Sequence, residues 1–183
     1  MHFSSIIAVA GLASVVSSHG VITKPIPRVV NNASIAACGT AVTKKITADV
    51  TDHVEGLPEA AAKDAGYSAA KCNLWLCRGL QLDSTSNVET YYPGQVVPIQ
   101  VNLRIKHAGT ANVSIVDTKS NTISGTPLLY WSDYANEKLP TLPANNSAFS
   151  VTIPTGLEDK CSTAGACVSC TFYVAVAYID PAF

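Results

Sequence analysis

The stretch Gln95-Val-Val-Pro-Ile-Gln-Val-Asn-Leu-Arg-Ile-Lys106 alternates apolar and polar residues over nearly its whole length. Successive side chains of a β-strand point to opposite faces, so this stretch would bury one face and leave the other in water. The preceding Tyr92-Pro93-Gly94 is typical of a turn. These residues therefore predict a half-buried β-strand.

Short runs with strand-like composition follow at residues 111–117, 124–131, 148–154 and 171–178, separated by clusters of Gly, Pro and Asn. The short connection from His107 to Thr110 predicts a hairpin with His107 at its tip. Before these runs, residues 36–71 predict a long loop region with one short helix at 59–65. The pattern favours a mainly β fold, an immunoglobulin- or fibronectin-like antiparallel β-sandwich with long loops that contain short helices.

The first 18 residues carry no charged Asp, Glu, Lys or Arg, and an apolar run from Ile6 ends in Val16-Ser17-Ser18. The run is too short to span a bilayer, and its small terminal residues are typical of a signal peptidase site. We expect residues 1–18 to be a secretory signal peptide, with an uncleaved anchor as the alternative. Residues 19–183 then form one secreted, extracellular domain.

The formal net charge is −1, with no acidic or basic block. Neither nucleic acid nor a membrane surface is therefore an expected partner, and a neutral partner suits this charge balance better. The protein is expected to be a monomer. The chain also lacks a Gly-x-Ser-x-Gly elbow, a Gly-rich phosphate loop and a His-x-x-x-His zinc pattern. Trp75 and Trp131 are expected in the core rather than as sugar platforms.

All six cysteines follow the leader, which indicates disulfides in an oxidising compartment, with a zinc site as the alternative. Sequence proximity favours local bridges between Cys72 and Cys77 and between Cys161 and Cys167. The remaining cysteines are Cys38 and Cys170. Three sequons predict glycosylation at Asn32, Asn112 and Asn145, although Asn112 lies in an expected strand.

Cleavage after Ser18 would leave His19 at the N-terminus, where its α-amine and imidazole form a two-nitrogen chelate. A square-planar or T-shaped copper site needs a third nitrogen. His107 is the better candidate because a tight turn at a strand end can project its ring towards another loop. His53 lies among polar residues and is expected to be an exposed loop histidine.

Several short motifs carry a family likeness: His19-Gly-Val21, Pro25-x-Pro-Arg28, Ala37-Cys-Gly39, His53-Val-Glu-Gly-Leu57, Cys72-Asn-Leu-Trp-x-Cys77, His107-x-Gly-x-Ala-Asn-Val-Ser-Ile-Val-Asp117 and Lys160-Cys-Ser-Thr-Ala-Gly-x-Cys167. In this order they resemble fungal lytic polysaccharide monooxygenases, in particular a small cellulose-active family related to chitin-binding type-4 sequences. The likeness runs from His19 to about residue 168.

The resemblance implies a secreted copper enzyme in which the amine and ring of His19 and the ring of His107 bind Cu(2+). It implies oxidation of cellulose or chitin with an external electron donor. The family's C-terminal glutamine has no counterpart here, since no glutamine follows Gln100. The axial aromatic would come from Phe172, Tyr173 or Tyr178, with Tyr173 as the chosen candidate, and Cys38 would pair with Cys170 if its usual partner is missing. A non-catalytic copper- or polysaccharide-binding protein is the alternative function.

Overall fold

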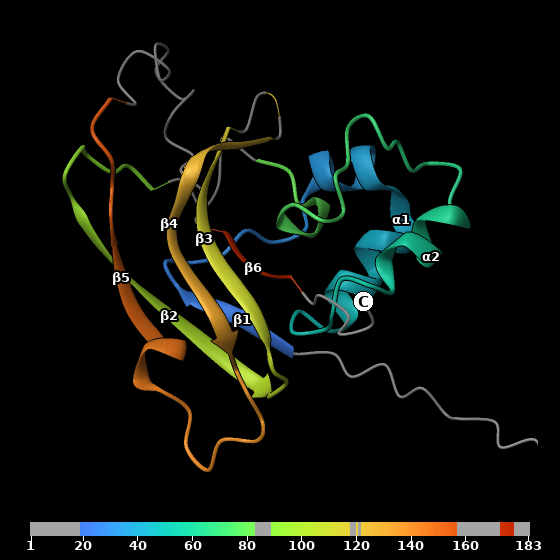
Figure 1. The fold of residues 1–183 in the computed structure, drawn as a ribbon. Helices are drawn as coiled ribbons and strands as arrows, with labels where there is room; N and C mark the ends of the chain where they lie inside the picture. Colours follow the sequence, from blue (N-terminus) through green and yellow to red (C-terminus); the bar gives the residue numbers. More distant parts are fainter. Residues whose placement is uncertain (1–18, 83–88, 118–119, 121, 157–172, 178–183) are drawn as a thin grey trace, which may run out of the picture.

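The computed structural model describes residues 19–82, 89–117, 120, 122–156 and 173–177. It contains two three-stranded antiparallel sheets that face each other (Figure 1). The first sheet has the order β1 (His19–Lys24), β2 (Val96–Ile105), β5 (Ala148–Thr152). The second has the order β4 (Thr122–Tyr134), β3 (Gly109–Asp117), β6 (Tyr173–Ala177). The prediction of an antiparallel β-sandwich is confirmed.

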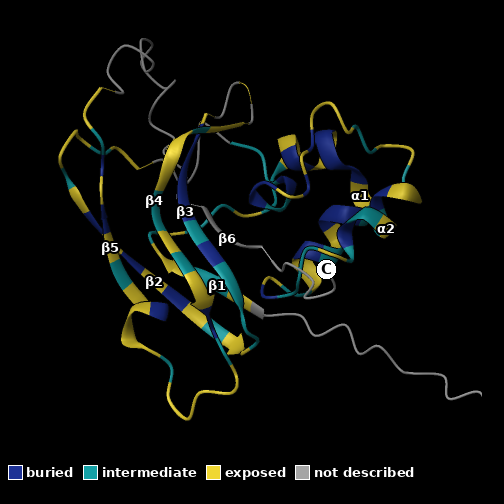
Figure 2. Ribbon diagram, in the orientation of Figure 1, coloured by how far each residue is buried: buried dark blue, intermediate teal, exposed yellow. Residues whose placement is uncertain are grey.

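The alternation in β2 produces the expected split between the two faces of this strand. Val97, Ile99 and Val101 are buried, whereas the residues between them are exposed. The buried side chains pack with Val113 of β3 and with Val151 near the end of β5. Burial of each of these side chains contributes about 1.5 to 3 kcal/mol, so this cluster holds the two sheets together. Figure 2 shows buried residues along β2 and β3, whereas most of β4 is exposed or half-buried.

Pro98 lies inside the central strand of its sheet, where a missing N–H normally disrupts pairing. β1 pairs with β2 only from Gln100 to Ile105, and β5 pairs from Val96 to Gln100. At Pro98 the strand is therefore paired on the β5 side alone, and the proline interrupts no ladder with β1.

The predicted hairpin between β2 and β3 is wrong. β2 pairs with β1 and β5, and β3 pairs with β4 and β6. Since both edges of each strand are already occupied, β2 and β3 cannot pair with each other, and residues 106–108 instead carry the chain from one sheet to the other. His107 lies in this crossing connection.

A helical lobe lies between β1 and β2 in the chain, and it holds more helix than the predicted short segment. α1 (Asn32–Ala48) is kinked at Gly39, which has φ 79°, and α2 (Leu57–Ala62) replaces the helix expected at 59–65. The structure also contains two short 3-10 helices, η1 (Cys77–Gly79) and η2 (Ala144–Asn146). The missed signal for α1 was Asn31, whose side chain accepts a hydrogen bond from the Ser34 backbone N–H at 2.7 Å and so caps the helix.

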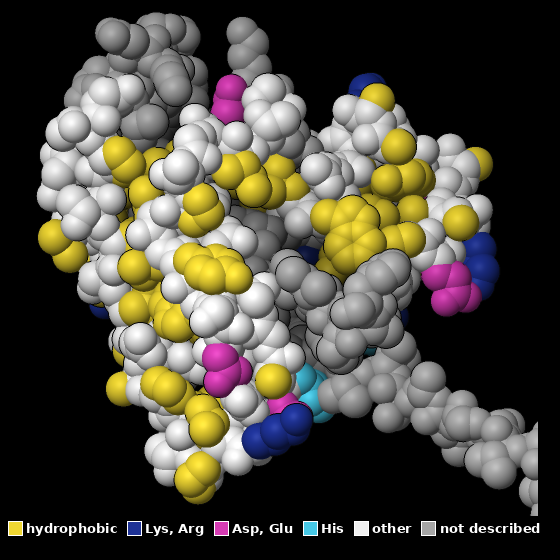
Figure 3. Space-filling model, in the orientation of Figure 1, with side chains coloured by type: hydrophobic (Ala, Val, Ile, Leu, Met, Phe, Trp, Pro, Cys, Tyr) yellow, Lys and Arg dark blue, Asp and Glu magenta, His cyan; other side chains and the backbone are white. Residues whose placement is uncertain are grey.

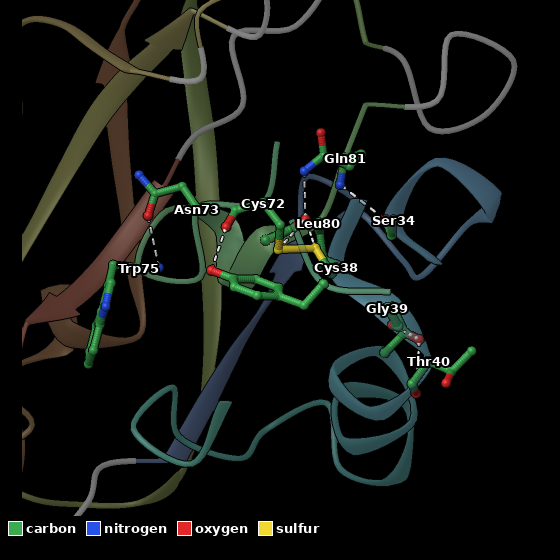
Figure 4. Close-up of a disulfide and its surroundings, with 12 residues drawn as sticks. Ser34, Cys38, Gly39, Thr40, Cys72, Asn73, Trp75, Leu80 and Gln81 are labelled. Carbon is green, nitrogen blue, oxygen red and sulfur yellow. Dashed lines mark hydrogen bonds between the residues drawn. A yellow bond between two sulfur atoms is a disulfide. The ribbon is translucent and has the colours of Figure 1, made fainter. Parts of the chain in front are cut away.

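A disulfide between Cys38 of α1 and Cys72 lies in the core of this lobe (Figure 4). The predicted pairs of Cys72 with Cys77 and of Cys38 with Cys170 are therefore wrong. A φ of 53° at Cys77 belongs to a tight turn that packs its side chain against Leu76 and Val116, away from the Cys38–Cys72 bond. Cys161, Cys167 and Cys170 lie outside the described residues.

Cys77 is a free thiol within the described part of the chain, and it is 6% exposed. Desolvation raises the pKa of Cys77 to about 11, against a smaller opposing effect of Arg28. At pH 8 only about one thiol in a thousand would be ionised. We expect iodoacetamide to leave Cys77 unlabelled in the native protein and to label it after denaturation, as measured by peptide mass spectrometry. Equally fast labelling in both states would contradict this environment.

The lobe is joined to the sandwich near the end of β2. Arg104 of β2 forms an ion pair with Asp49 at 2.9 Å and a hydrogen bond to the Thr51 hydroxyl at 3.2 Å. Arg78 donates to the Val50 carbonyl oxygen at 2.7 Å. These contacts fix the turn after α1 beside the same end of the sandwich that carries residues 106–108.

The three sequon asparagines differ in accessibility. Asn32 and Asn145 are exposed, whereas Asn112 is half-buried in β3. The Asn112 side-chain oxygen accepts a hydrogen bond from the buried Ser114 hydroxyl at 2.8 Å. Glycosylation at Asn32, Asn112 and Asn145 stays a prediction, and the first and last of these positions offer the more accessible side chains.

Candidate metal centre

The pairing of β1 with β2 brings the two candidate histidines to one end of the first sheet. β1 begins at His19, and His19 is paired with Ile105, the last residue of β2. Adjacent strands lie about 4.8 Å apart, and His107 follows Ile105 by two residues. The antiparallel register therefore places the backbone of His19 beside the connection that carries His107.

The His107 side chain has one ring nitrogen in an unusual environment. Nδ1 is buried and has no hydrogen-bond partner among the residues that the structure describes. A buried polar atom without a partner costs free energy, and a metal ion can satisfy a ring nitrogen in the same way as a hydrogen bond. His107 is therefore able to act as a nitrogen donor at this end of the sandwich.

A carboxylate lies next to His107. The Ala108 backbone N–H donates a hydrogen bond to Glu137 Oε2 at 2.6 Å. Hydrogen bonds from the backbone N–H groups of Glu137 and Ala108 lower the pKa of Glu137, and the nearby His107 ring lowers it further. Glu137 is thus ionised at neutral pH. Only the tertiary structure reveals this neighbour, because 29 residues separate Ala108 from Glu137.

His53 occupies a different environment, as expected. Its Nδ1 lies 2.9 Å from Glu55 Oε2, and its Nε2 lies 3.5 Å from Asp52 Oδ1. Both ring nitrogens therefore face carboxylates of its own loop. This arrangement gives the His53 ring partners within its own loop.

Comparison with known families gives a match over most of this chain. The family model described as lytic polysaccharide mono-oxygenase, cellulose-degrading, matches residues 19–163. The chain belongs to this family of lytic polysaccharide monooxygenases. A search of curated proteins finds no match. Within the described residues, no helix combines the length and the apolar character needed to cross a membrane.

The expected donor set of a lytic polysaccharide monooxygenase can be compared with the residues at this site. Among the described residues, no group of three or more His, Cys, Asp or Glu side chains could hold a metal ion. A metal at this end would therefore depend on imidazole nitrogens, together with an α-amine at His19 if residues 1–18 are removed as predicted. Nitrogen donors of this kind suit Cu(2+), and the unpartnered Nδ1 of His107 is consistent with such a donor set.

The register of β6 bears on Tyr173, the predicted axial aromatic residue. Tyr173 is paired with Ser114, whereas Ala177 is paired with Thr110, close to His107. At about 3.4 Å per residue, Tyr173 lies roughly 14 Å further along the sheet than Ala177. The structure therefore does not bring the backbone of Tyr173 close to His107. The residue that follows Ala177 in the sequence is Tyr178, which lies outside the described residues, as does Phe172.

The two tryptophans differ in how far they are buried. Trp131 is half-buried and packs against Phe149 with ring centroids 4.9 Å apart, which confirms its expected place in the core. The same expectation is wrong for Trp75, which is 60% exposed. Figure 4 shows its ring pointing away from the disulfide, while the neighbouring Leu74 and Leu76 are buried. Trp75 lies in a turn that is closed by a hydrogen bond from the Leu76 backbone N–H to the Asn73 carbonyl oxygen at 3.1 Å, and this turn leaves its ring exposed.

Proposed function

We propose that this chain is a secreted, monomeric, copper-dependent lytic polysaccharide monooxygenase that oxidises glycosidic carbons of cellulose. The observation that carries the proposal is the register of β1 with β2, which pairs His19 with Ile105, two residues before His107. The family match begins at His19, the residue that becomes N-terminal if residues 1–18 are removed as a signal peptide. Family members are generally copper-dependent and typically secreted, which supports the same reading.

Three nitrogens of this chain would hold Cu(2+): the α-amine and ring of His19 and the ring of His107. Bound copper would supply the one-electron chemistry that activates O₂ or H₂O₂. With O₂, two electrons from an external donor and two protons give the hydroxylated carbon and one water. With H₂O₂, the same hydroxylation releases one water and needs no further electrons once the copper is reduced. Loss of the glycosidic oxygen from the hydroxylated carbon then breaks the chain.

The balance of charges supports a neutral polymer as the partner. The formal net charge is −1, and the face shown in Figure 3 carries few charged side chains. Apolar side chains are spread over both the sandwich and the helical lobe on that face. A neutral polysaccharide can approach such a surface without the electrostatic cost that a nucleic acid or an anionic membrane would meet.

The proposed N-terminal ligand makes copper binding depend on pH. A free α-amine has a pKa of about 8 and must lose its proton to bind a metal. We expect the Cu(2+) affinity to fall about tenfold for each pH unit below 8, down to the range in which histidine also titrates. Isothermal titration calorimetry between pH 6.5 and 8 measures this slope. A chain that retains Ser18 before His19 serves as the control, because its α-amine no longer belongs to His19.

The activity test uses copper-loaded protein that begins at His19, incubated with cellulose and ascorbate under air or with added H₂O₂. Mass spectrometry of the soluble products should show oxidised oligosaccharides that are absent without copper or without the reductant. A parallel incubation with chitin tests the other candidate substrate. Failure to produce oxidised products from either polymer would contradict the proposed activity.

The second candidate is a copper- or polysaccharide-binding protein without turnover. Two observations favour it: the family match ends at residue 163, and the β6 register keeps Tyr173 away from His107. The residues around metal ligands tune the reactivity of the metal, so a changed C-terminal strand can leave binding intact while turnover is lost. Tight copper binding together with the absence of oxidised products would support this candidate.

A further inference from the structure

Glu137 belongs to a loop that is fixed firmly to the sandwich. β4 ends at Tyr134, whose hydroxyl donates to the Asn146 carbonyl oxygen at 2.6 Å. The Ala135 backbone N–H donates to Asn146 Oδ1 at 2.9 Å, and this bond holds Ala135 at a φ of 54°. Tyr134, Ala135 and Asn146 are all at most 1% exposed. The two ends of the loop are therefore clamped together in a buried hydrogen-bonded cluster.

Hydrogen bonds of the Asn136 side chain also hold the part of the loop that carries Glu137. The Asn136 side chain donates to Asp133 Oδ2 at 3.1 Å and accepts from the Lys138 backbone N–H at 2.9 Å. These bonds span both sides of Glu137. The backbone on both sides of Glu137 is therefore held by hydrogen bonds, and this fixes the position from which its carboxylate extends.

The same loop starts next to the connection that carries His107. Tyr134 is paired with Gly109, so residues 135–137 and residues 106–108 extend beyond the same paired end of β3 and β4. The hydrogen bond from the Ala108 N–H to Glu137 joins the two segments. Without that bond, the connection between the two sheets would lose this side-chain anchor at the residue that follows His107.

We propose that Glu137 is a positioning residue for His107, which holds the connection between β2 and β3 so that the imidazole is presented to a copper ion. This inference rests on the proposed function for the identity of the metal. The path runs from the buried Asn146 clamp, through the ordered loop, to the Glu137 carboxylate and the Ala108 N–H. Groups that orient a metal ligand in this way typically change metal affinity by about 10- to 100-fold when they are removed.

The carboxylate also places a negative charge beside the site, and the two effects can be separated. Glu137 is solvent-exposed, so water and salt screen its charge, and we expect the charge to contribute less than the hydrogen bond. Glu137→Gln removes the charge but keeps an oxygen that can accept from Ala108. Glu137→Ala removes both. The matched control is Glu59→Gln, an exposed glutamate of α2 that is paired with Lys63.

Each variant is prepared with a chain that begins at His19. Cu(2+) affinity is measured by competition titration, and the copper hyperfine splitting is measured by electron paramagnetic resonance. We expect Glu137→Ala to weaken binding about tenfold and to change the splitting. Glu137→Gln should stay within about threefold of the wild type with an unchanged splitting, as expected for a screened charge. The positioning role would be overturned if Glu137→Ala kept the wild-type Cu(2+) affinity and splitting. Equal losses of affinity in both Glu137 variants would also overturn it.

A readout without copper separates this inference from the proposed function. In ¹H–¹⁵N spectra of the metal-free protein, Glu137→Ala should shift the Ala108 amide and the His107 ring signals, and Glu59→Gln should not. If the wild type binds no copper but these shifts occur, the proposed function fails and the positioning of His107 stands. If the wild type binds copper and the shifts are absent, the positioning role fails alone.

Discussion

Replacement of His107 by alanine is expected to lower the Cu(2+) affinity of the processed chain by more than 100-fold. Groups that only orient a metal ligand change affinity by about 10- to 100-fold, and removal of the ligand itself should exceed that range. The amine and ring of His19 would still bind copper weakly as a two-nitrogen chelate. Competition titration gives the affinity, and electron paramagnetic resonance should show the loss of one nitrogen donor.

His53→Ala is the matched control for this variant. His53 is also a half-buried loop histidine, but its two ring nitrogens face Asp52 and Glu55. We expect its loss to leave copper affinity and the resonance spectrum unchanged. A similar loss of affinity in both variants would indicate a general effect on folding, and an effect of His53→Ala alone would contradict the proposed ligand set.

Removal of the Cys38–Cys72 disulfide is expected to have the largest effect on stability. The bond closes a loop of 34 residues, so the loop-entropy relation predicts a loss of about 4 kcal/mol in the free energy of unfolding for the Cys38→Ala/Cys72→Ala variant. Both sulfurs also lie in the core of the helical lobe, where each cysteine is 0% exposed. Urea denaturation followed by circular dichroism measures this loss.

The structure around Gly79 adds a second reason for this effect. A Cβ at Gly79 would clash with the Sγ atoms of Cys72 and Cys38, so the chain packs directly against the bond. Addition of a reductant should destabilise the wild type towards the value of the double alanine variant. That variant lacks the bond, so a reductant cannot destabilise it by breaking this disulfide. Equal stability of the oxidised wild type and the variant would contradict the prediction.

The amino-acid sequence determined the fold class because strand periodicity is a local property. The alternation in residues 95–106 predicted β2 to within one residue at each end, and the buried face is the one that the pattern indicates. The runs that became β3, β4, β5 and β6 were also recognised from local composition. Each of these patterns depends on neighbouring side chains within one strand, so no knowledge of the rest of the molecule was needed.

Local patterns could not determine which strands pair. A hairpin between β2 and β3 satisfied every local signal, yet β1 and β5 occupy the edges of β2, and β4 and β6 occupy the edges of β3. The same limit applies to the cysteines, because Cys72 and Cys77 are close in sequence, while α1 brings Cys38 to Cys72 across 34 residues. The kink at Gly39 made α1 less evident than its length warrants, and the cap at Asn31 was the local signal that could have revealed it.

The two histidines of the candidate site came from the sequence, since an apolar run that ends before His19 and the end of the predicted strand before His107 are both local signals. Their proximity was decided by the tertiary structure. The antiparallel register of β1 with β2 brings His19 to Ile105, and the β4–β5 loop brings Glu137 to Ala108. The register of β6 likewise separates Tyr173 from His107. The physical reason is the same in each case: hydrogen bonds between strands and loops far apart in the sequence set these distances.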